Sequence, residues 1–374
     1  MQAERKALVI GGGIAGMSAA IALRQAGLSV DVCDRDPHWK VYGAGITITG
    51  PTLRAMGRLG VLDEVLRQGY AADGIDVCST DGRKLMTIDT RSDALGGIPS
   101  AGGILRPTLH SIISARLLTL GPTMMLGVTV ETLENEADHV NIVFSTGKSA
   151  RYDLVVGADG IYSRTRQQLF PDAPRPHYAG QYCWRLMMPR HPDILRRTFF
   201  LGGQGKVGLN PVSPDSMYMF YVEAQAEPIW RDETKQHLLL SELLSPYGGV
   251  LKDVRNKLTA SSQIVCRPLE TVFVGEDWTK GRTVLIGDAA HATTPQLASG
   301  AGMGIEDGLV LGEEIGRNVD IAAGLSAFMA RRYDRCKLVV DSSLEISRLE
   351  REQAPPAAQT AVVERALATL NEEF

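Results

Sequence analysis

The chain has 374 residues, of which 44% are hydrophobic and 22% charged, and its formal net charge is -4 at pH 7. This composition is ordinary for a globular protein with two domains, and the scattered Lys and Arg residues argue against nucleic-acid binding. No apolar run has the length of a membrane span, and the N-terminal residues show no signal-peptide pattern, so we expect a cytoplasmic protein. Five widely spaced cysteines without a Cys-x-x-Cys pair predict reduced thiols and no metal site.

The N-terminal segment has the pattern of a dinucleotide-binding fold. A buried strand is predicted over residues 6–10 and a helix over residues 14–27. Glycines in G-x-G-x-x-G spacing join them: Gly11, Gly13 and Gly16. They permit a tight turn and a close approach of the backbone to a diphosphate at the helix start. The next strand, over residues 29–33, delivers Asp34 where its carboxylate could accept ribose hydroxyls. This context favours a dinucleotide over a plain glycine-rich turn.

The following segment adds two ambiguous ligand candidates. Gly45 leaves the backbone bare in an extended run, which fits either a second wall of the site or a glycine-softened strand. Arg106 precedes a predicted helix over residues 107–120, where it could clamp a diphosphate or lie on the solvated surface. The other predicted elements of this segment are a helical stretch over 52–68, strands over 74–89, a loop or domain crossing over 94–103, and two strands over 129–143.

Two later strands each end in a turn that carries an acid. A strand over residues 154–156 leads into a turn with Asp159, and a strand over residues 283–286 leads into Gly287 and Asp288. Small residues from 299 to 304 then open a helix predicted over 305–315, whose bare N–H groups could face an electron-rich ligand. Taken singly, these segments also fit an ordinary β-turn and an ordinary strand-loop-helix connection.

The three motifs together resemble the group A flavoprotein monooxygenases, the aromatic hydroxylases of the p-hydroxybenzoate and salicylate hydroxylase type. The motifs are G-x-G-x-x-G at the N-terminus, G-A-D-G-x-x-S-x-x-R from residue 157, and G-D-A-A-H from residue 287. The stretch CWRLMMPR at residues 183–190 looks nearest to hydroxylases of pyridines and quinolones. The resemblance implies an α/β fold: a Rossmann-like FAD-binding domain of the glutathione-reductase type, an interleaved β-sheet substrate domain and a C-terminal helix.

The resemblance also implies a set of FAD-binding residues. The ADP half would be held by Gly11, Gly13, Ala15, Gly16 and Asp34, and the rest of the cofactor by Lys40, Gly45, Arg106, Asp159, Asp288, Pro295, Gly300 and Ala301. Two positions depart from the family pattern: Lys40 stands where Arg is usual, and Ser299 where Gln is usual. These departures concern the fine positioning of the flavin. His291 is expected to shape the flavin loop rather than to reach substrate, and no general base is assigned.

A second domain should supply the substrate wall. Strands are predicted over 182–188, 198–201, 206–210 and 217–222, followed by mostly helical structure over 232–258. Inward-facing residues of such strands are substrate candidates, and the chosen ones are Arg185, Asn210 and Tyr221, with Tyr218 also considered. Structural residues on a solvated sheet are the alternative for each of them.

The resemblance, together with the predicted elements, implies a domain division and a function. The FAD-binding domain is predicted at 1–72, 101–176 and 276–340, the substrate domain at 73–100 and 177–275, and a C-terminal helical tail at 341–374. The expected reaction is hydroxylation of a small electron-rich aromatic or N-heteroaromatic compound through a C4a-hydroperoxyflavin, with NADH or NADPH and dioxygen consumed. The alternatives are a flavin-dependent reductase or dehydrogenase without oxygen transfer, and a non-catalytic binding protein. A monomer or a homodimer is expected.

Overall fold

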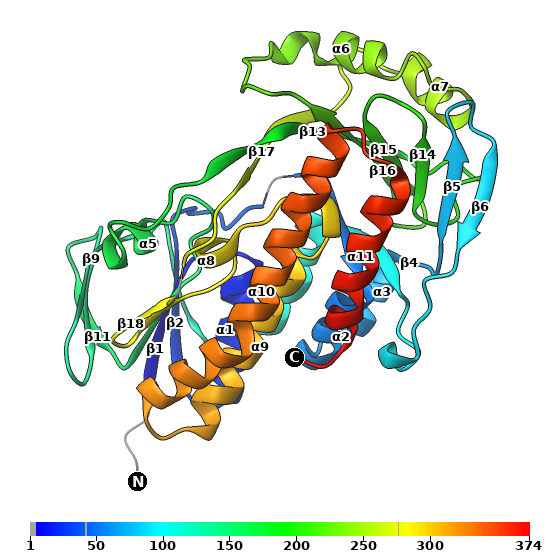
Figure 1. Ribbon diagram of the computed structural model, residues 1–374. Helices are drawn as coiled ribbons and strands as arrows, with labels where there is room; N and C mark the ends of the chain where they lie inside the picture. The colour runs from blue at the N-terminus through cyan, green and yellow to red at the C-terminus, as the bar shows by residue number, and fades with distance from the viewer. Residues whose placement is uncertain (1–4, 42, 276) are drawn as a thin grey trace.

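A six-stranded sheet lies at the centre of one half of the fold (Figure 1). The structure is a computed structural model that describes residues 5–41, 43–275 and 277–374. The strands are parallel except for β18, which is antiparallel to β19. Their order is β18 (Thr279–Lys280), β19 (Thr283–Leu285), β12 (Leu154–Gly157), β1 (Lys6–Ile10), β2 (Ser29–Asp34) and β8 (Thr123–Leu126). Because β1 has β2 on one side and β12 on the other, its carboxyl end lies at the point where the strand order reverses, the usual ligand position in such folds.

The two faces of this sheet are covered differently. Ala7, Val9 and Val156 face the main hydrophobic core with the helices, whereas Leu8 and Val155 face a second cluster. That cluster is formed with the three-stranded sheet of β11 (Ser149–Tyr152), β10 (Val140–Phe144) and β9 (Val130–Asn135). This alternation is the two-residue period of a strand buried on both faces.

Two helices meet on the main core through small residues. They are α1 (Ile14–Gln25) and α9 (Gly300–Arg317). A Cβ atom at Gly308 would lie 2.4 Å from the Ala19 nitrogen, and one at Gly312 would lie 2.5 Å from Ala22 Cβ. Glycine is therefore required in the interior of α9 by close helix packing, despite its cost in helix propensity.

The remaining elements of this half surround the same core. They are α2 (Gly50–Leu59), α3 (Leu62–Gln68), α4 (Arg106–Leu118), α5 (Arg164–Leu169), α8 (Asp288–His291), and the 3-10 turns η1 (Asp93–Leu95) and η3 (Pro295–Leu297). A small antiparallel sheet adds β3 (Gly45–Thr49), β7 (Ala101–Leu105) and β4 (Tyr70–Ala71).

A seven-stranded sheet forms the second layer. Its order is β17 (Ile264–Thr271), β13 (His177–Pro189), β16 (Ser216–Ala224), β15 (Lys206–Pro211), β14 (Thr198–Leu201), β5 (Ile75–Ser79) and β6 (Lys84–Ile88). One face packs in a separate core that includes residues of α6 (Gln236–Leu243) and α7 (Gly249–Asn256), after the short turn η2 (Glu233–Lys235). We call this the helix-covered face, and the opposite side, which β3 and α10 cover in part, the open face.

The long helix α10 (Ile321–Arg351) connects the two layers (Figure 1). Near its end, Glu350 accepts hydrogen bonds from Gln181 at 3.0 Å and from Lys206 at 2.8 Å, both on the seven-stranded sheet. The chain then turns back as α11 (Pro356–Asn371), beside α10 and α2. None of the helices in the described part of the chain is both long and apolar enough to cross a membrane.

The predicted α/β fold class is confirmed, and two local predictions need correction. The helix expected over 52–68 is two helices, because Gly60 takes a left-handed conformation (φ 80°) that ends α2. The segment 94–103, expected as loop, contains the start of β7, which pairs with β3. The expected domain boundaries stay a prediction, although segments 75–88 and 177–271 together build the seven-stranded sheet.

Candidate active site

The glycine-rich loop after β1 leaves its backbone open to a ligand. A Cβ at Gly11 would lie 2.4 Å from the Ala158 carbonyl oxygen, and one at Gly16 would lie 1.9 Å from the Gly11 carbonyl oxygen, so both positions require glycine. Gly13 has open space around it and caps α1 without any side-chain hydrogen bond. The first N–H groups of α1 are therefore available to an anion, and the helix dipole favours negative charge there.

Asp34 lies directly beside this loop. Its carboxylate accepts hydrogen bonds from the Gly12 N–H at 2.7 Å and the Asp36 N–H at 2.8 Å. A carboxylate has lone pairs for further donors, so Asp34 can fix the loop and also accept a ribose hydroxyl.

Two aromatic residues that the sequence analysis missed pack on the same loop. Trp39 donates from its ring nitrogen to the Gly12 carbonyl at 2.8 Å, and its φ of 48° is left-handed, which is uncommon for a bulky residue. The ring of His110, on α4, meets the Trp39 ring edge-on with centroids 5.2 Å apart. His110 Nε2 is buried without a hydrogen-bond partner among the described residues. Burial lowers the pKa of His110, which leaves a neutral ring nitrogen available to a ligand.

Asp159 lies next to the glycine-rich loop, but its carboxylate is already occupied. A Cβ at Gly11 would lie 3.1 Å from Asp159 Cα. The carboxylate accepts from the N–H groups of Arg164 (2.9 Å) and Thr165 (3.0 Å) and from the Ser163 hydroxyl. Asp159 therefore holds the start of α5, and its contribution to a ligand site would be made through the shape of its turn.

The turn after β19 approaches the same helix start. A Cβ at Gly287 would lie 2.8 Å from Ala15 Cβ, and Gly287 has a left-handed φ of 57°. Arg166, which is buried, donates to the Ala289 carbonyl at 2.9 Å and to the Ile161 carbonyl at 2.7 Å. The three sequence motifs, far apart along the chain, therefore meet around the N-terminus of α1.

Asp288, in this turn, and Arg106, at the start of α4, both keep polar groups open. Both residues are exposed, and neither side chain has a hydrogen-bond partner among the described residues. Desolvation by the surrounding protein lowers the pKa of Arg106, while Asp288 acts to raise it and Arg185 to lower it. Asp288 and Arg185 thus each lie within electrostatic range of Arg106.

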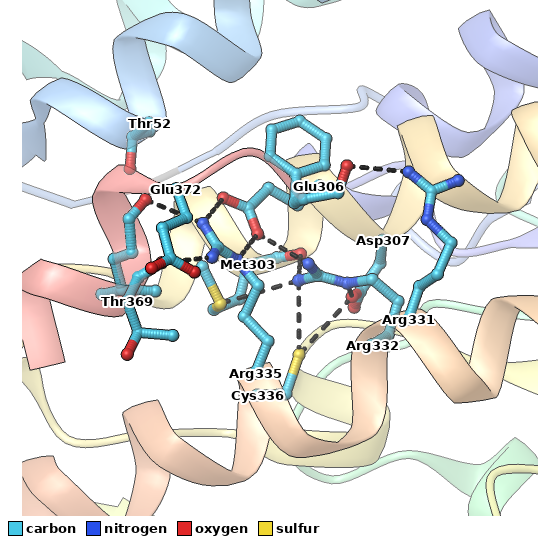
Figure 2. A network of polar contacts seen from close by, with 12 residues as sticks. Thr52, Met303, Glu306, Asp307, Arg331, Arg332, Arg335, Cys336, Thr369 and Glu372 are labelled. Atoms are coloured by element: carbon cyan, nitrogen blue, oxygen red, sulfur yellow. Dashed lines mark hydrogen bonds and ion pairs between the residues drawn. The ribbon is translucent and has the colours of Figure 1, made fainter. Parts of the chain in front are cut away.

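His291 is buried and bonded to Asp307, which belongs to the buried charged network drawn in Figure 2. Its Nε2 lies 2.6 Å from Asp307 Oδ2, which also accepts the Gly287 N–H at 2.8 Å. Burial opposes the charged imidazole, but Cys336 and Asp307 raise the pKa of His291 well above its ordinary value. Arg332 donates to Asp307 Oδ1 at 2.8 Å. His291 therefore supports the Gly287 turn from behind, as expected for a residue that shapes the loop.

The same network contains a triad with the ligand atoms of a metal site: His291, Asp307 and Cys336, all buried, with these atoms within 4.8 Å of one another. Arg332 already brings a positive charge to two of them, because it also donates to the Cys336 sulfur at 3.3 Å. Cation binding would have to compete with this guanidinium.

The segment from Pro295 to Ala301 lies between the two layers. Gln296 donates to Gln181 of β13 at 2.8 Å. Ser299 is buried and caps α9 without a side-chain bond to the helix, because its hydroxyl donates to the Leu297 carbonyl at 3.0 Å. The N–H groups at Gly300 and Ala301 thus remain free of side-chain caps. Lys40 is exposed, with its N–H bonded to Asp36 at 3.3 Å.

The strand register sorts the substrate candidates by face. Arg185 pairs with Phe220, and Asn210 with Tyr218, and these four lie on the open face. Tyr221 lies on the helix-covered face, where it is 2% exposed in the core near α6 and α7. The choice of Tyr221 as a substrate residue is therefore corrected. It failed because adjacent residues of a strand point to opposite sides of the sheet.

Two other chosen residues serve the contact between the layers. Asn210 donates to Thr47 Oγ1 at 3.0 Å, and the Tyr218 hydroxyl also bonds to Thr47. A Cβ at Gly45 would lie 2.3 Å from the Tyr218 ring, so this glycine permits β3 to approach the open face. The structure thus gives Gly45 a packing role and brings Tyr218 to the junction.

This geometry defines a dinucleotide-binding α/β protein whose nucleotide layer packs against a second sheet. A model of the FAD binding domain family matches residues 4–343. The chain is 31% identical to the 2-heptyl-3-hydroxy-4(1H)-quinolone synthase of Pseudomonas aeruginosa, over 93% of this chain and 90% of that protein. It is 30% identical to the 3-amino-4-hydroxybenzoate 2-monooxygenase of Streptomyces cremeus, over 88% and 82% respectively. The crystal structure of Klebsiella pneumoniae HpxO with FAD and uric acid superposes with a TM-score of 0.85 at 25% identity, covering 100% of this chain and 94% of that one.

The chain belongs to the FAD binding domain family, and it is an FAD-dependent monooxygenase of the aromatic hydroxylase class. The predictions of family, fold, enzyme class and cofactors are confirmed at this level. The open groups also fit FAD physically. The bare start of α1 suits a diphosphate, the unbonded Asp288 and Arg106 suit polar groups of the cofactor, and the unpartnered His110 Nε2 lacks an acceptor or donor that a ligand would supply.

Proposed function

We propose that this protein hydroxylates a small aromatic or N-heteroaromatic compound held between the open face of the seven-stranded sheet and FAD. The observation that carries the proposal is that Arg185, on that face, lies within electrostatic range of Arg106, which has Asp288 of the nucleotide layer as its other charged neighbour. The two layers would then act as the FAD-binding and substrate-binding domains of the predicted division. The quinolone and aminohydroxybenzoate substrates in the names of the relatives support a planar ring substrate.

The assigned residues would divide the work as follows. Gly11, Gly13, Ala15, Gly16 and Asp34 would hold the ADP half of FAD, with the turn of Asp159 shaping this end. Arg106, Asp288, Pro295, Gly300 and Ala301 would contact the remainder, and Lys40 lies nearby in sequence to the Trp39 contact. Trp39 and His110 join this set because their side chains pack against the glycine-rich loop.

Bound FAD, reduced by NADH or NADPH, supplies the oxygen-activating chemistry. The chain's own part is to place the ring and to exclude water. Aromatic side chains on the open face offer an apolar floor, with the Tyr218 and Phe220 rings 6.1 Å apart and the Phe199 and Phe220 rings 5.8 Å apart. The Tyr218 hydroxyl, in its chain with Thr47 and Asn210, is the polar group placed to contact a ring hydroxyl.

Purified protein tests this proposal directly. It should be yellow, and a panel of phenols, hydroxypyridines and quinolones should contain a compound that accelerates NAD(P)H oxidation and gains one oxygen atom by mass. Peroxide formation without a heavier product for every compound would contradict hydroxylation.

Asp288→Ala tests the cofactor assignment. Loss of a hydrogen bond to a charged group costs about 1.5–3 kcal/mol, so FAD should bind roughly 10- to 100-fold more weakly, measured by flavin release during ultrafiltration. Asp172→Ala, at an exposed aspartate on the surface, is the matched control and should retain FAD. Equal retention in both variants would remove the assignment.

We further propose a cytoplasmic location, supported by the five free cysteines, and a monomer or homodimer as the working form. Size-exclusion chromatography with light scattering decides between these two states.

A further inference from the structure

A second arginine on the open face has no partner. Arg197 precedes β14 and points the same way as Phe199, two residues on. Its guanidinium carbon lies 4.7 Å from the centre of the Phe199 ring. Among the described residues it has no ion pair, and no side-chain hydrogen bond is formed to any of its nitrogens, while its Nε is sealed from solvent.

The surroundings of Arg197 do not compensate its charge. Burial lowers the pKa of Arg197, Tyr218 opposes this effect, and no carboxylate contributes. A cation-π contact with one ring is weaker than the cost of desolvating an unpaired guanidinium. The fold therefore keeps a charge at this place that the protein itself does not satisfy, which is typical of a group awaiting a ligand.

Strand register places Arg197 within the proposed substrate wall. Continuing the antiparallel pairing of β14 and β15 by one residue sets Arg197 opposite Asn210, which pairs with Tyr218 of β16. The neighbouring row on the same face is Phe199, Gly208, Phe220 and Arg185. Gly208 leaves room there for the Phe220 ring, whose nearest atom would lie 2.6 Å from an added Cβ. Arg197 and Arg185 thus lie at opposite ends of one aromatic floor.

The two ends of the floor differ in their neighbours. Arg185 lies within electrostatic range of Arg106, which has Asp288 as its other charged neighbour, whereas Arg197 has none of these groups among its electrostatic neighbours. An anion bound by Arg197 would therefore lie at the end of the floor remote from Asp288.

We propose that the substrate is an aromatic or N-heteroaromatic acid whose carboxylate is bound by Arg197, at the end of the ring floor remote from Asp288. The inference rests on the proposed function, since it places the acid on the proposed substrate wall. A guanidinium matches a planar carboxylate with two parallel N–H donors, and the Phe199 and Phe220 rings would stack with or flank the aromatic part.

The test compares each acid with its neutral amide, which has nearly the same shape. FAD-loaded protein is titrated with 4-hydroxybenzoate against 4-hydroxybenzamide, and with 6-hydroxynicotinate against 6-hydroxynicotinamide, and binding is read from the change in flavin absorbance. We expect the wild type to bind at least one acid about 10- to 100-fold more tightly than its amide. Arg197→Gln should reduce this ratio to near one, and Arg197→Lys should keep part of it.

Arg196→Gln is the matched control. Arg196 is the preceding residue, and unlike Arg197 it has an acidic neighbour: its guanidinium lies 3.9 Å from the Asp76 carboxylate. This variant should keep the wild-type ratio of acid to amide binding.

Several results would overturn the inference. They are a wild-type protein whose flavin spectrum no acid changes, amides that bind as well as the acids, and an unchanged ratio in Arg197→Gln. A loss of NADPH use or of FAD in Arg197→Gln with the acid preference intact would assign the arginine to a phosphate instead, and would also overturn it. If the wild type binds FAD and adds oxygen to a neutral compound, the proposed function stands and only this inference fails; a protein that takes up no FAD refutes the function itself.

Discussion

Two groups of arginines in this protein have opposite surroundings. Arg332 and Arg335 on α10 are buried, and carboxylates and carbonyl groups satisfy them (Figure 2). Arg332 donates to Glu306 at 2.6 Å and to Asp307 at 2.8 Å. Arg335 binds Glu306 with two nitrogens, at 2.8 and 3.1 Å. We call Arg106, Arg185 and Arg197 the cleft arginines because we propose that they line the ligand site. Among the described residues none of them has an acidic partner within hydrogen-bond distance.

This difference distinguishes arginines that stabilise the fold from arginines whose donors are free to bind a ligand. Arg335 also donates to the Thr369 and Leu370 carbonyls at 2.8 and 2.9 Å, so the buried network ties the end of α11 to α9. Through Asp307 it reaches the Gly287 N–H, next to Asp288. The buried arginines therefore hold the turn that the FAD site needs, whereas the cleft arginines keep their donors free for molecules that enter.

The largest effect is expected from breaking the buried group. Arg332→Met leaves Glu306 and Asp307 with less positive charge in a dry interior, and removal of one partner of such a network costs about 3–5 kcal/mol of unfolding free energy. Urea denaturation at a fixed excess of FAD measures this loss.

Its neighbour Arg331 is the matched control. Arg331 pairs with Glu313 and Glu314, but its side chain is 28% exposed. Arg331→Met should cost about 1 kcal/mol or less, because partly solvated ion pairs contribute little. Equal losses in the two variants would contradict the division between structural and cleft arginines.

A smaller effect is expected from acid. In the folded chain burial opposes ionisation of Asp307, but His291 and Arg332 hold the pKa of its carboxyl below the ordinary value of 3.8. The free energy of unfolding that ionised Asp307 contributes is therefore fully present above pH 3.8 and is lost as the pH falls toward the folded pKa. The loss is at most about 1.4 kcal/mol per pH unit, the value for one proton. The pKa of His291 is raised, so its contribution is complete below 6.5 and is lost only as the pH rises through the folded value.

Unfolding free energies across a pH series compare the wild type with Asp307→Asn. The gap between them should be constant from about pH 5 to 6.5 and should narrow below about pH 4, because the unfolded wild-type chain then takes up a proton at Asp307 that the folded chain does not. A gap that does not change with pH would show that Asp307 acts by packing alone.

The sequence predicted the parts of the site that depend on backbone geometry. Motifs in the sequence identify glycines that a tight turn or a close contact requires, because such positions recur at fixed spacing. Gly11, Gly16 and Gly287 are of this kind. The burial of β1 on both faces was likewise visible in the sequence, as an unbroken apolar run from Ala7 to Ile10.

Side-chain partners were not accessible in the same way. The Asp159 carboxylate is used by α5, and His110 contacts Trp39 across the glycine-rich loop, and both depend on tertiary packing. Arg197 could have been noticed only after strand register placed it on the open face. The left-handed conformation of Trp39 carries no sequence signal, since aromatic residues seldom adopt it.

Tyr218 and Tyr221 illustrate the same limit and give the smallest expected effect. The two tyrosines are three residues apart in β16 and point to opposite faces, so composition alone could not separate them. Tyr221→Phe removes a hydroxyl from the core beside α6 and α7 and should leave substrate binding and the fraction of NAD(P)H oxidation coupled to product unchanged. Tyr218→Phe removes the hydroxyl bonded to Thr47 and should lower that coupled fraction, because the open face loses its central polar group. Product formed per NAD(P)H consumed measures both variants with the compound that the panel identifies. If Tyr221→Phe uncouples the reaction as strongly as Tyr218→Phe, the assignment of the open face as the substrate wall is wrong.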